Sequence, residues 1–177
     1  TVLSESVRVA GDEINDSIAT YLKKVHNLVV GERTAEDIKI KIGSAFPSNE
    51  FDLQSIDVRG LHLLSGLPRS INLKAGDLRE AMSEPLNKIV DAVKRTLERT
   101  PPELAADIVD RGIMLAGGGA LVRGISDLLS HETGIFTHVA EDPLLCVVNG
   151  CGQVLDNFKS MRRVLDTPDF ARNVIRD

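Results

Sequence analysis

The sequence predicts an α/β fold with a small antiparallel sheet inserted between larger elements. Stretches with apolar residues at helical spacing alternate with short apolar runs, which is typical of alternating helices and strands. Within residues 46–83 the pattern changes to closely spaced β-like runs, which indicate a small antiparallel sheet. The small sheet is therefore expected to be an insert between larger elements, and the weak periodicity of the tail at 161–177 indicates disorder.

The first elements follow from local patterns. Residues 1–9 are predicted to form a strand with valines at positions 2, 7 and 9. A helix follows from Gly11, because apolar residues recur once per turn and acidic residues occupy its first turn, where the helix dipole favours them. A second helix is predicted over 35–44, capped by Thr34 and ended by Pro47. Because the chain opens with Thr rather than Met in an apparent strand, we expect it to be a fragment.

The remaining elements follow from the same rules. In the insert, β-like runs over 51–58, 61–64 and 70–73 are separated by glycines and a proline. Beyond it, periodicity and breakers predict helices over 76–99, 101–109, 120–129 and 142–158, with apolar strands over 112–116 and 135–140.

The composition fits a globular protein with an aliphatic core. Hydrophobic residues make up 42% of the 177 residues and charged residues 27%, which disfavours disordered and membrane-spanning classes. The net charge is −5 with both signs interspersed, so no basic face is available for a phosphate backbone. Aromatic residues make up only 3%, which disfavours base-stacking platforms. We therefore expect no nucleic-acid partner.

The two cysteines favour a reducing compartment. Cys146 and Cys151 are five residues apart within one predicted helix, so they lie on different faces and form neither a disulfide nor a metal pair. No apolar run approaches the roughly 20 residues that span a bilayer, and no charged-then-apolar leader opens the chain. These features favour a cytosolic protein.

The strongest candidate site is an apolar strand that runs into three glycines and a predicted helix. Glycines let the backbone turn sharply and approach a ligand, and a helix N-terminus presents unpaired N–H groups. Gly117, Gly118, Gly119 and Ala120 are therefore candidates for a nucleotide site. A tight turn that needs a positive φ explains the same glycines equally well.

A second candidate is the helix predicted over 35–44. A rotation of 100° per residue places Glu36, Lys39 and Gly43 on one face and apolar side chains on the opposite one. The polar face offers a carboxylate for ribose hydroxyls, an ammonium for a ring or phosphate, and a gap for a planar base. Taken alone, a solvated Glu36–Lys39 ion pair is the simpler interpretation.

A third candidate is the glycine followed by two acids at the first strand-to-helix junction. Asp12 and Glu13 are expected to be ordinary first-turn acids, whereas the bare backbone of Gly11 could edge a base or sugar. The four histidines have no metal-ligand spacing, and the P-loop, GxGxxG and GxSxG motifs do not occur. P-loop NTPase, serine hydrolase and zinc enzyme interpretations therefore lack a motif.

The three candidates, in this order and with an insert between the second and third, resemble the second large domain of actin-like ATPases. The residues are most similar to the MreB family of bacterial actins, from about residue 7 to 157. The segments that carry the resemblance are residues 7–13, 31–36, 40–45, 58–60, 66–69, 101–105, 117–121 and 140–144. The resemblance implies an actin-like (ribonuclease H-like) domain II of a fold in which two domains built on five-stranded sheets face each other across a nucleotide cleft. It also implies that residues 1–43 and 85–140 form the large subdomain, that residues 46–83 form a small inserted α+β subdomain, and that residues 141–160 return to the other domain.

The resemblance also implies ATP as the ligand and assigns roles to the candidate residues. Glu36 and Lys39 would face the ribose and base, the segment from Gly117 to Ala120 would line the α-phosphate and nucleoside, and Gly11 would edge the purine. A one-residue slip of the alignment would bring in Asp37 and Ile40 instead. The family's phosphate loops, its Mg-binding acid and its water-activating residue precede the segment matched here, so we expect no catalytic residue or Mg ligand in this chain.

For the intact protein, the resemblance implies an ATPase that polymerises at the cytoplasmic face of the cell membrane and organises cell-wall synthesis to maintain rod shape. The implied partners are further copies of itself, a RodZ-like membrane adaptor and the cell-wall elongation machinery, with membrane contact through the other half. The helix over 142–158 would cross back to that half. Two alternatives remain: another ATPase of this fold, such as a sugar kinase or Hsp70-like chaperone, and an interaction module that binds no nucleotide.

Overall fold

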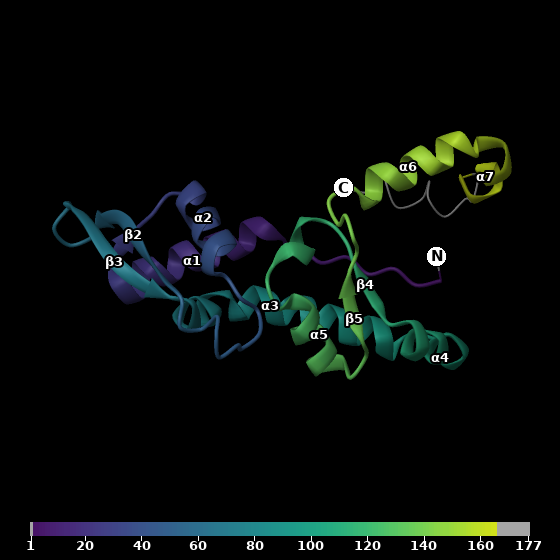
Figure 1. Ribbon diagram of the computed structural model, residues 1–177, viewed down its shortest axis with the longest axis horizontal. Coiled ribbons are helices and arrows are strands. Elements are labelled where there is room, and N and C mark those ends of the chain that lie inside the picture. The colour runs from purple at the N-terminus through teal and green to yellow at the C-terminus, as the bar shows by residue number, and fades with distance from the viewer. Residues whose placement is uncertain (1, 166–177) are drawn as a thin grey trace.

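The computed structural model describes residues 2–165 and combines helices with two small sheets (Figure 1). The elements are α1 (Gly11–His26), β1 (Leu28–Val29), α2 (Glu32–Ile42), β2 (Ser55–His62), β3 (Pro68–Lys74), α3 (Ala75–Glu98), α4 (Pro102–Arg111), β4 (Ile113–Leu115), the 3₁₀ turn η1 (Gly118–Leu121), α5 (Ile125–Thr133), β5 (Thr137–Val139), α6 (Cys146–Asp156) and α7 (Phe158–Leu165). Strands β1, β2 and β3 form one sheet, and β4 and β5 form another.

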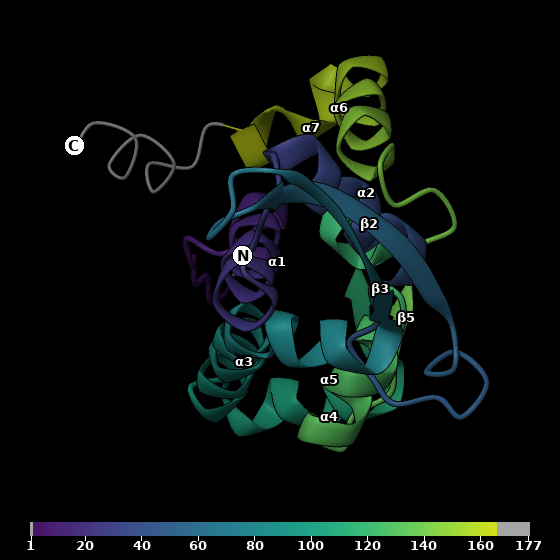
Figure 2. The same cartoon turned by 90° about the vertical axis from the view of Figure 1, so that its left-hand side faces the viewer.

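Helices α1, α2 and α3 form the core because each carries an apolar stripe. On α1 the stripe consists of Ile14, Ile18 and Leu22, which are all buried, as the predicted spacing requires. Val25, the next position in that pattern, is 56% exposed because the helix reaches the surface there. Figure 2 shows α1 beside α3, with α2 and β2 on its other side. Each fully buried aliphatic side chain contributes roughly 1.5–3 kcal/mol.

The insert contains the predicted antiparallel sheet, but with two long strands instead of three short runs. Strand β2 pairs with β3 from Ser55↔Lys74 to Leu61↔Pro68 and continues through Gly60. A Cβ at Gly60 would lie 2.5 Å from the carbonyl oxygen of Val29, so the glycine allows β1 to approach β2 closely. The short strand β1 escaped the sequence prediction because two residues carry no periodicity.

The C-terminal part differs from the prediction where glycines interrupt the chain. Strands β4 and β5 pair in parallel, in agreement with the two predicted apolar strands. The helix predicted over 120–129 is instead the single turn η1 followed by α5, which begins at Ile125. Gly124, with φ of +73°, separates the two because this left-handed conformation ends helical geometry. Helix α6 begins at Cys146, four residues later than predicted.

The predicted strand over 1–9 is wrong for residues 2–9, which form no strand. A strand requires a neighbouring strand for its backbone hydrogen bonds, and none pairs with this segment within the described residues. The segment is instead attached to α3 through Glu5, whose carboxylate lies 2.7 Å from the guanidinium of Arg95. The sheet formed by β4 and β5 accordingly has two strands in the described part of the chain, against the five of the implied domain.

The last two described helices form an arm beside the body (Figure 1). Helix α6 has no buried residue, and Val147 and Leu155 are more than 70% exposed. Residues 161–165, the start of the tail that was expected to be disordered, belong to α7, and positions 166–177 lie outside the described residues. Both cysteines of α6 are free, as predicted. Within residues 2–165, no helix combines the length and apolar character that a membrane crossing requires.

Candidate functional site

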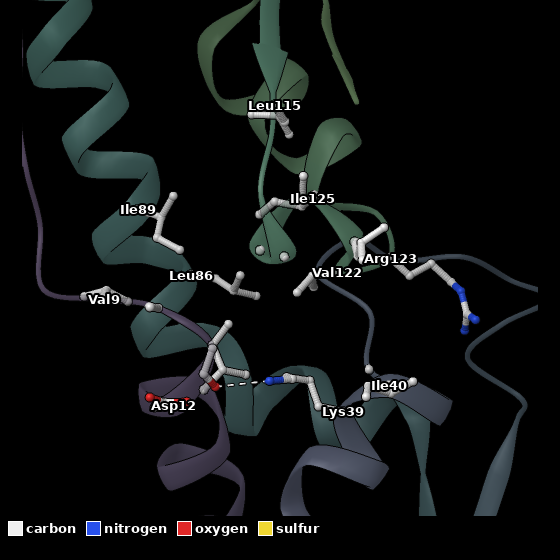
Figure 3. Close-up of a pocket in the computed structure, with 18 of the residues that line it drawn as sticks. Val9, Asp12, Lys39, Ile40, Leu86, Ile89, Leu115, Val122, Arg123 and Ile125 are labelled. Carbon is white, nitrogen blue, oxygen red and sulfur yellow. Dashed lines mark hydrogen bonds between the residues drawn. The ribbon is translucent and has the colours of Figure 1, made fainter. Parts of the chain in front are cut away.

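A cavity of about 750 Å³ lies between α1, α2, α3 and the segment around η1 (Figure 3). This volume falls within the range typical of small-molecule sites. The residues that line it are Val9, Ala10, Gly11, Asp12, Ile14, Glu36, Lys39, Ile40, Gly43, Leu86, Ile89, Leu115, Ala116, Gly118, Gly119, Ala120, Leu121, Val122, Arg123 and Ile125. All three candidate segments of the sequence therefore meet at one cavity.

One wall of the cavity is the polar face of α2. Glu36, Lys39 and Ile40 line the cavity, whereas Asp37 does not. The opposite face is buried through Ala35, Ile38 and Ile42, which confirms the two-faced helix predicted from its 100° rotation. The helix begins at Glu32 instead of after Thr34, because the Ala35 N–H already donates to the Gly31 carbonyl at 3.1 Å.

Lys39 connects this wall to the start of α1. Its Nζ donates a hydrogen bond of 3.1 Å to the Gly11 carbonyl oxygen, drawn as a dashed line in Figure 3. A Cβ at Gly11 would lie 3.3 Å from the same Nζ, so the glycine leaves room for the ammonium. An ammonium has three N–H donors, so up to two remain for a ligand. Glu36 and Lys39 form no ion pair among the described residues, and the Lys39 ammonium instead contacts the Gly11 carbonyl.

The glycine segment forms the opposite wall, and its glycines serve two purposes. Gly117 has φ of +83° and donates its N–H to the Pro143 carbonyl at 2.7 Å, and it does not line the cavity. Gly118 and Gly119 have no positive φ but do line the cavity. The tight-turn interpretation therefore holds for the first glycine, and the close-approach interpretation fits the next two.

The expected helix N-terminus at this wall is absent. Gly118 and Gly119 are the first two residues of the four-residue 3₁₀ turn η1, in which Ala120 is buried, and no regular helix begins there. One 3₁₀ turn aligns too few peptide units for a substantial dipole, so the helix-dipole argument for a phosphate does not apply here. This wall can instead bring its backbone close to a ligand, because Gly118 and Gly119 have no side chains.

Most of the remaining lining is apolar and was not predicted as part of the site. Leu86 and Ile89 of α3 face the cavity, together with Leu115, Val122 and Ile125 (Figure 3). The two α3 residues follow the helical spacing of apolar residues within 76–99, and periodicity alone cannot distinguish a core position from a cavity floor. An apolar floor below a few polar groups suits a ligand in which a planar ring is joined to a group that carries hydroxyls.

The acids after Gly11 divide into a cavity residue and a cap. Asp12 lines the cavity (Figure 3), whereas Glu13 turns back and accepts the Ala10 N–H at 2.8 Å. This backbone hydrogen bond holds the pKa of Glu13 below its ordinary value of 4.5. Glu13 is therefore a first-turn acid with a capping contact, as predicted. No group of three or more His, Cys, Asp or Glu residues within the described part of the chain is placed to hold a metal ion.

Solved structures with a similar fold belong to bacterial actin-like proteins. The crystal structure of MreB5 of Spiroplasma citri bound to ADP matches 94% of this chain with a TM-score of 0.85 and 34% sequence identity, and the match covers 49% of that protein. A MamK double helical filament matches 76% of this chain and 41% of that protein, with a TM-score of 0.63 and 18% identity, which shows the fold alone. The predicted actin-like α/β fold class is therefore confirmed.

Protein sequences give the same assignment. The cell shape-determining protein Mbl of Bacillus subtilis (strain 168) is 46% identical over 160 residues, which cover 90% of this chain and 47% of that protein. The cell shape-determining protein MreB of Escherichia coli (strain K12) is 48% identical over 155 residues, which cover 88% of this chain and 44% of that protein. The chain thus spans about half the length of these relatives. The model of the MreB/Mbl protein family matches residues 1–163, and the chain belongs to this family.

Proposed function

We propose that this chain forms the nucleoside side of an ATP-binding cleft in a filament-forming, cell shape-determining protein. The observation that carries the proposal is the cavity at which Glu36 and Lys39 of α2 face the segment from Gly118 to Ala120. The similar MreB5 protein was crystallised with ADP and also with AMPPNP, which supports an adenine nucleotide as the ligand.

Each group of the cavity has a distinct role in this proposal. The Glu36 carboxylate accepts hydrogen bonds from ribose hydroxyls, and the free N–H donors of Lys39 face the ring edge or the α-phosphate. Gly118 and Gly119 let the backbone approach the nucleoside, while Gly11 edges the purine. The apolar floor takes up the ring. Gly117 and Asp37, which the resemblance also suggested, do not line the cavity and have no contact role.

The groups that would contact the β- and γ-phosphates and Mg²⁺ lie, in this proposal, in the half of the protein that this chain does not cover. ATP hydrolysis is then a property of the intact protein, in which nucleotide draws the two halves together and favours the polymerising conformation. This chain contributes binding and orientation of the nucleoside. The exposed apolar side chains of α6 contact the other half.

Titration of the 177-residue chain with adenosine and with ADP tests the nucleoside-side assignment. We expect dissociation constants on the order of 1 mM for both ligands, because half a site supplies roughly −4 kcal/mol and no group for the terminal phosphate. Glu36→Ala should weaken both ligands, and Glu103→Ala on α4 is the matched control. Micromolar ADP binding would contradict the half-site assignment, and no binding of either ligand would favour the interaction module.

For the intact protein, we propose ATP-dependent filaments at the inner face of the cell membrane that organise cell-wall synthesis, with a RodZ-like adaptor as partner. The relatives named cell shape-determining proteins support this over the sugar kinase and chaperone alternatives. Sedimentation of a protein extended to the relatives' length, with and without ATP, is the test. Pelleting that depends on ATP is expected, whereas a monomer at every concentration would contradict filament formation.

A further inference from the structure

The turn after the glycines is attached to the loop that leads into the insert. The carbonyl oxygen of Arg123 accepts the Ala45 N–H at 2.7 Å, and Ser44 and Arg123 form an isolated parallel bridge. The Arg123 side chain adds a second contact, because its guanidinium carbon lies 3.7 Å from the centroid of the Phe51 ring. Arg123 therefore joins the segment after the glycines to the loop after α2, although the two are distant in the sequence.

The guanidinium of Arg123 is directed away from the cavity. In Figure 3 its side chain extends outward, while the side chains of Val122 and Ile125 lie toward the other lining residues. Arg123 forms no salt bridge within the described residues, so its position depends on the face of the Phe51 ring. A guanidinium over an aromatic face is attracted by the ring quadrupole.

Phe51 is a fixed partner because its neighbours are attached to α3. Phe51 is only 8% exposed. The next residue, Asp52, pairs with Arg79 of α3, and the Gln54 carbonyl accepts the Ala75 N–H at 2.9 Å. The stack of Arg123 on Phe51 therefore connects the glycine wall to the long core helix, in addition to the backbone contact at Ala45.

We propose that Arg123 is a positioning residue of the nucleoside site. By stacking on Phe51, it holds the wall from Gly118 to Val122 at a fixed position relative to α3, without its guanidinium touching the ligand. The proposal rests on the proposed nucleoside function of the cavity. A wall held in place before binding loses less freedom when the ligand enters, so release of the stack lowers the affinity.

Amide hydrogen exchange of the free 177-residue chain tests the positioning without any ligand. In Arg123→Ala and in Phe51→Leu, exchange of the Ala45 amide, which donates to Arg123, should rise about three- to fivefold. The double variant should show no further rise, because both substitutions remove the same stack. Arg111→Ala, at the end of α4, is the matched control and should leave this amide unchanged. Additive effects, or no effect, would overturn the positioning role.

Adenosine titration of the same variants tests the consequence for binding. We expect Arg123→Ala and Phe51→Leu each to weaken binding about three- to fivefold, with no further loss in the double variant. Arg123→Lys should retain part of the affinity, because an ammonium is also attracted to the face of an aromatic ring. Thermal unfolding identifies variants that do not fold, and Arg123→Lys then carries the comparison.

The outcomes separate this inference from the proposed function. If the unaltered chain binds no adenosine, the nucleoside function fails, and hydrogen exchange at Ala45 still decides whether Arg123 positions the wall. If the unaltered chain binds adenosine and both single variants bind it equally well, the function stands and the inference is overturned.

Discussion

The two walls of the cavity are held in place by different means. The α2 wall is one face of a regular helix whose other face is buried through Ala35, Ile38 and Ile42. The glycine wall is a single 3₁₀ turn with one buried residue, Ala120. It is held by individual contacts, namely the backbone hydrogen bonds at Gly117 and Arg123 and the stack on Phe51. Burial of apolar surface fixes the first wall, and specific geometry fixes the second.

This difference predicts different responses to substitution. Loss of a buried side chain from α2 affects the core shared with α1 and α3, so it lowers the stability of the whole chain. Loss of one contact at the glycine wall affects a segment with few buried atoms, so it changes local opening and ligand affinity more than global stability. Three predictions test this distinction and a fourth tests the first turn of α1, in order of decreasing expected effect on stability.

The largest effect is expected for Ile38→Ala on the buried face of α2. Ile38 is 2% exposed, and truncation of a buried isoleucine costs about 2–5 kcal/mol because it leaves a cavity. Ile40 lies on the cavity face of the same helix and is 66% exposed, so Ile40→Ala should change the stability by no more than about 0.5 kcal/mol. Urea unfolding of both variants measures the difference. Equal losses would show that burial does not determine the position of this wall.

An intermediate effect is expected for Gly117→Ala at the start of the glycine wall. Gly117 has φ of +83° and ψ of 176°, a region that is nearly restricted to glycine, so alanine should cost about 1–3 kcal/mol. Gly119→Ala is the matched control, because no heavy atom lies within 4 Å of its Cβ position and its φ is not positive. The control should unfold like the unaltered chain but bind adenosine more weakly. A stable Gly117→Ala chain would remove the turn argument.

A smaller effect is expected for Lys39→Met, which keeps the apolar stem but removes the hydrogen bond to the Gly11 carbonyl. A net hydrogen bond contributes about 0.5–1.5 kcal/mol, and partial exposure places this one near the lower limit. Lys39→Met should weaken adenosine binding by a larger factor than Lys41→Met, which is the control on the same helix. Calorimetric titration and urea unfolding measure the two effects. Unchanged binding by Lys39→Met would exclude the ammonium from the nucleoside site.

The smallest effect is a pH dependence at the start of α1. The hydrogen bond from the Ala10 N–H lowers the pKa of Glu13 below 4.5, so the folded state favours the carboxylate. The stabilisation is complete above the unfolded-state pKa and disappears as the pH falls below 4.5 through the folded-state pKa.

Urea unfolding at about pH 6 and about pH 3 measures this contribution. The unaltered chain should lose more stability between these conditions than Glu13→Gln, in which the titrating group is removed. Glu103→Gln, in the first turn of α4, is the matched control. An identical pH response of the unaltered chain and Glu13→Gln would show that the cap contributes nothing.

Periodic segments could be predicted from the sequence because their pattern is local. The apolar stripe of α1, the two faces of α2 and the long helix α3 each repeat at the helical period, so side-chain burial follows from residue type and spacing alone. The insert was predicted as a sheet because its runs are bounded by turn residues. Family membership also followed from the sequence, since the ordered landmarks extend over nearly the whole chain.

Segments whose structure depends on a distant neighbour could not be predicted in the same way. Residues 2–9 have the alternation of a strand but no neighbouring strand within the described residues, and Glu5 instead pairs with Arg95. The helix expected after the glycines ends at once because Gly124 adopts a positive φ next to Phe46, where a Cβ would lie 3.0 Å from the Phe46 nitrogen. In both cases the local preference was overridden by tertiary contacts.

The sequence by itself determined the family, the main helices and the face of α2 that carries Glu36 and Lys39, because these depend on residue type and short spacing. Only the tertiary structure decided which glycine turns the chain and which glycines line the cavity. It alone revealed the apolar floor and the stack of Arg123 on Phe51. A backbone dihedral and a contact between remote residues depend on the packing of the whole chain, and no local pattern encodes them.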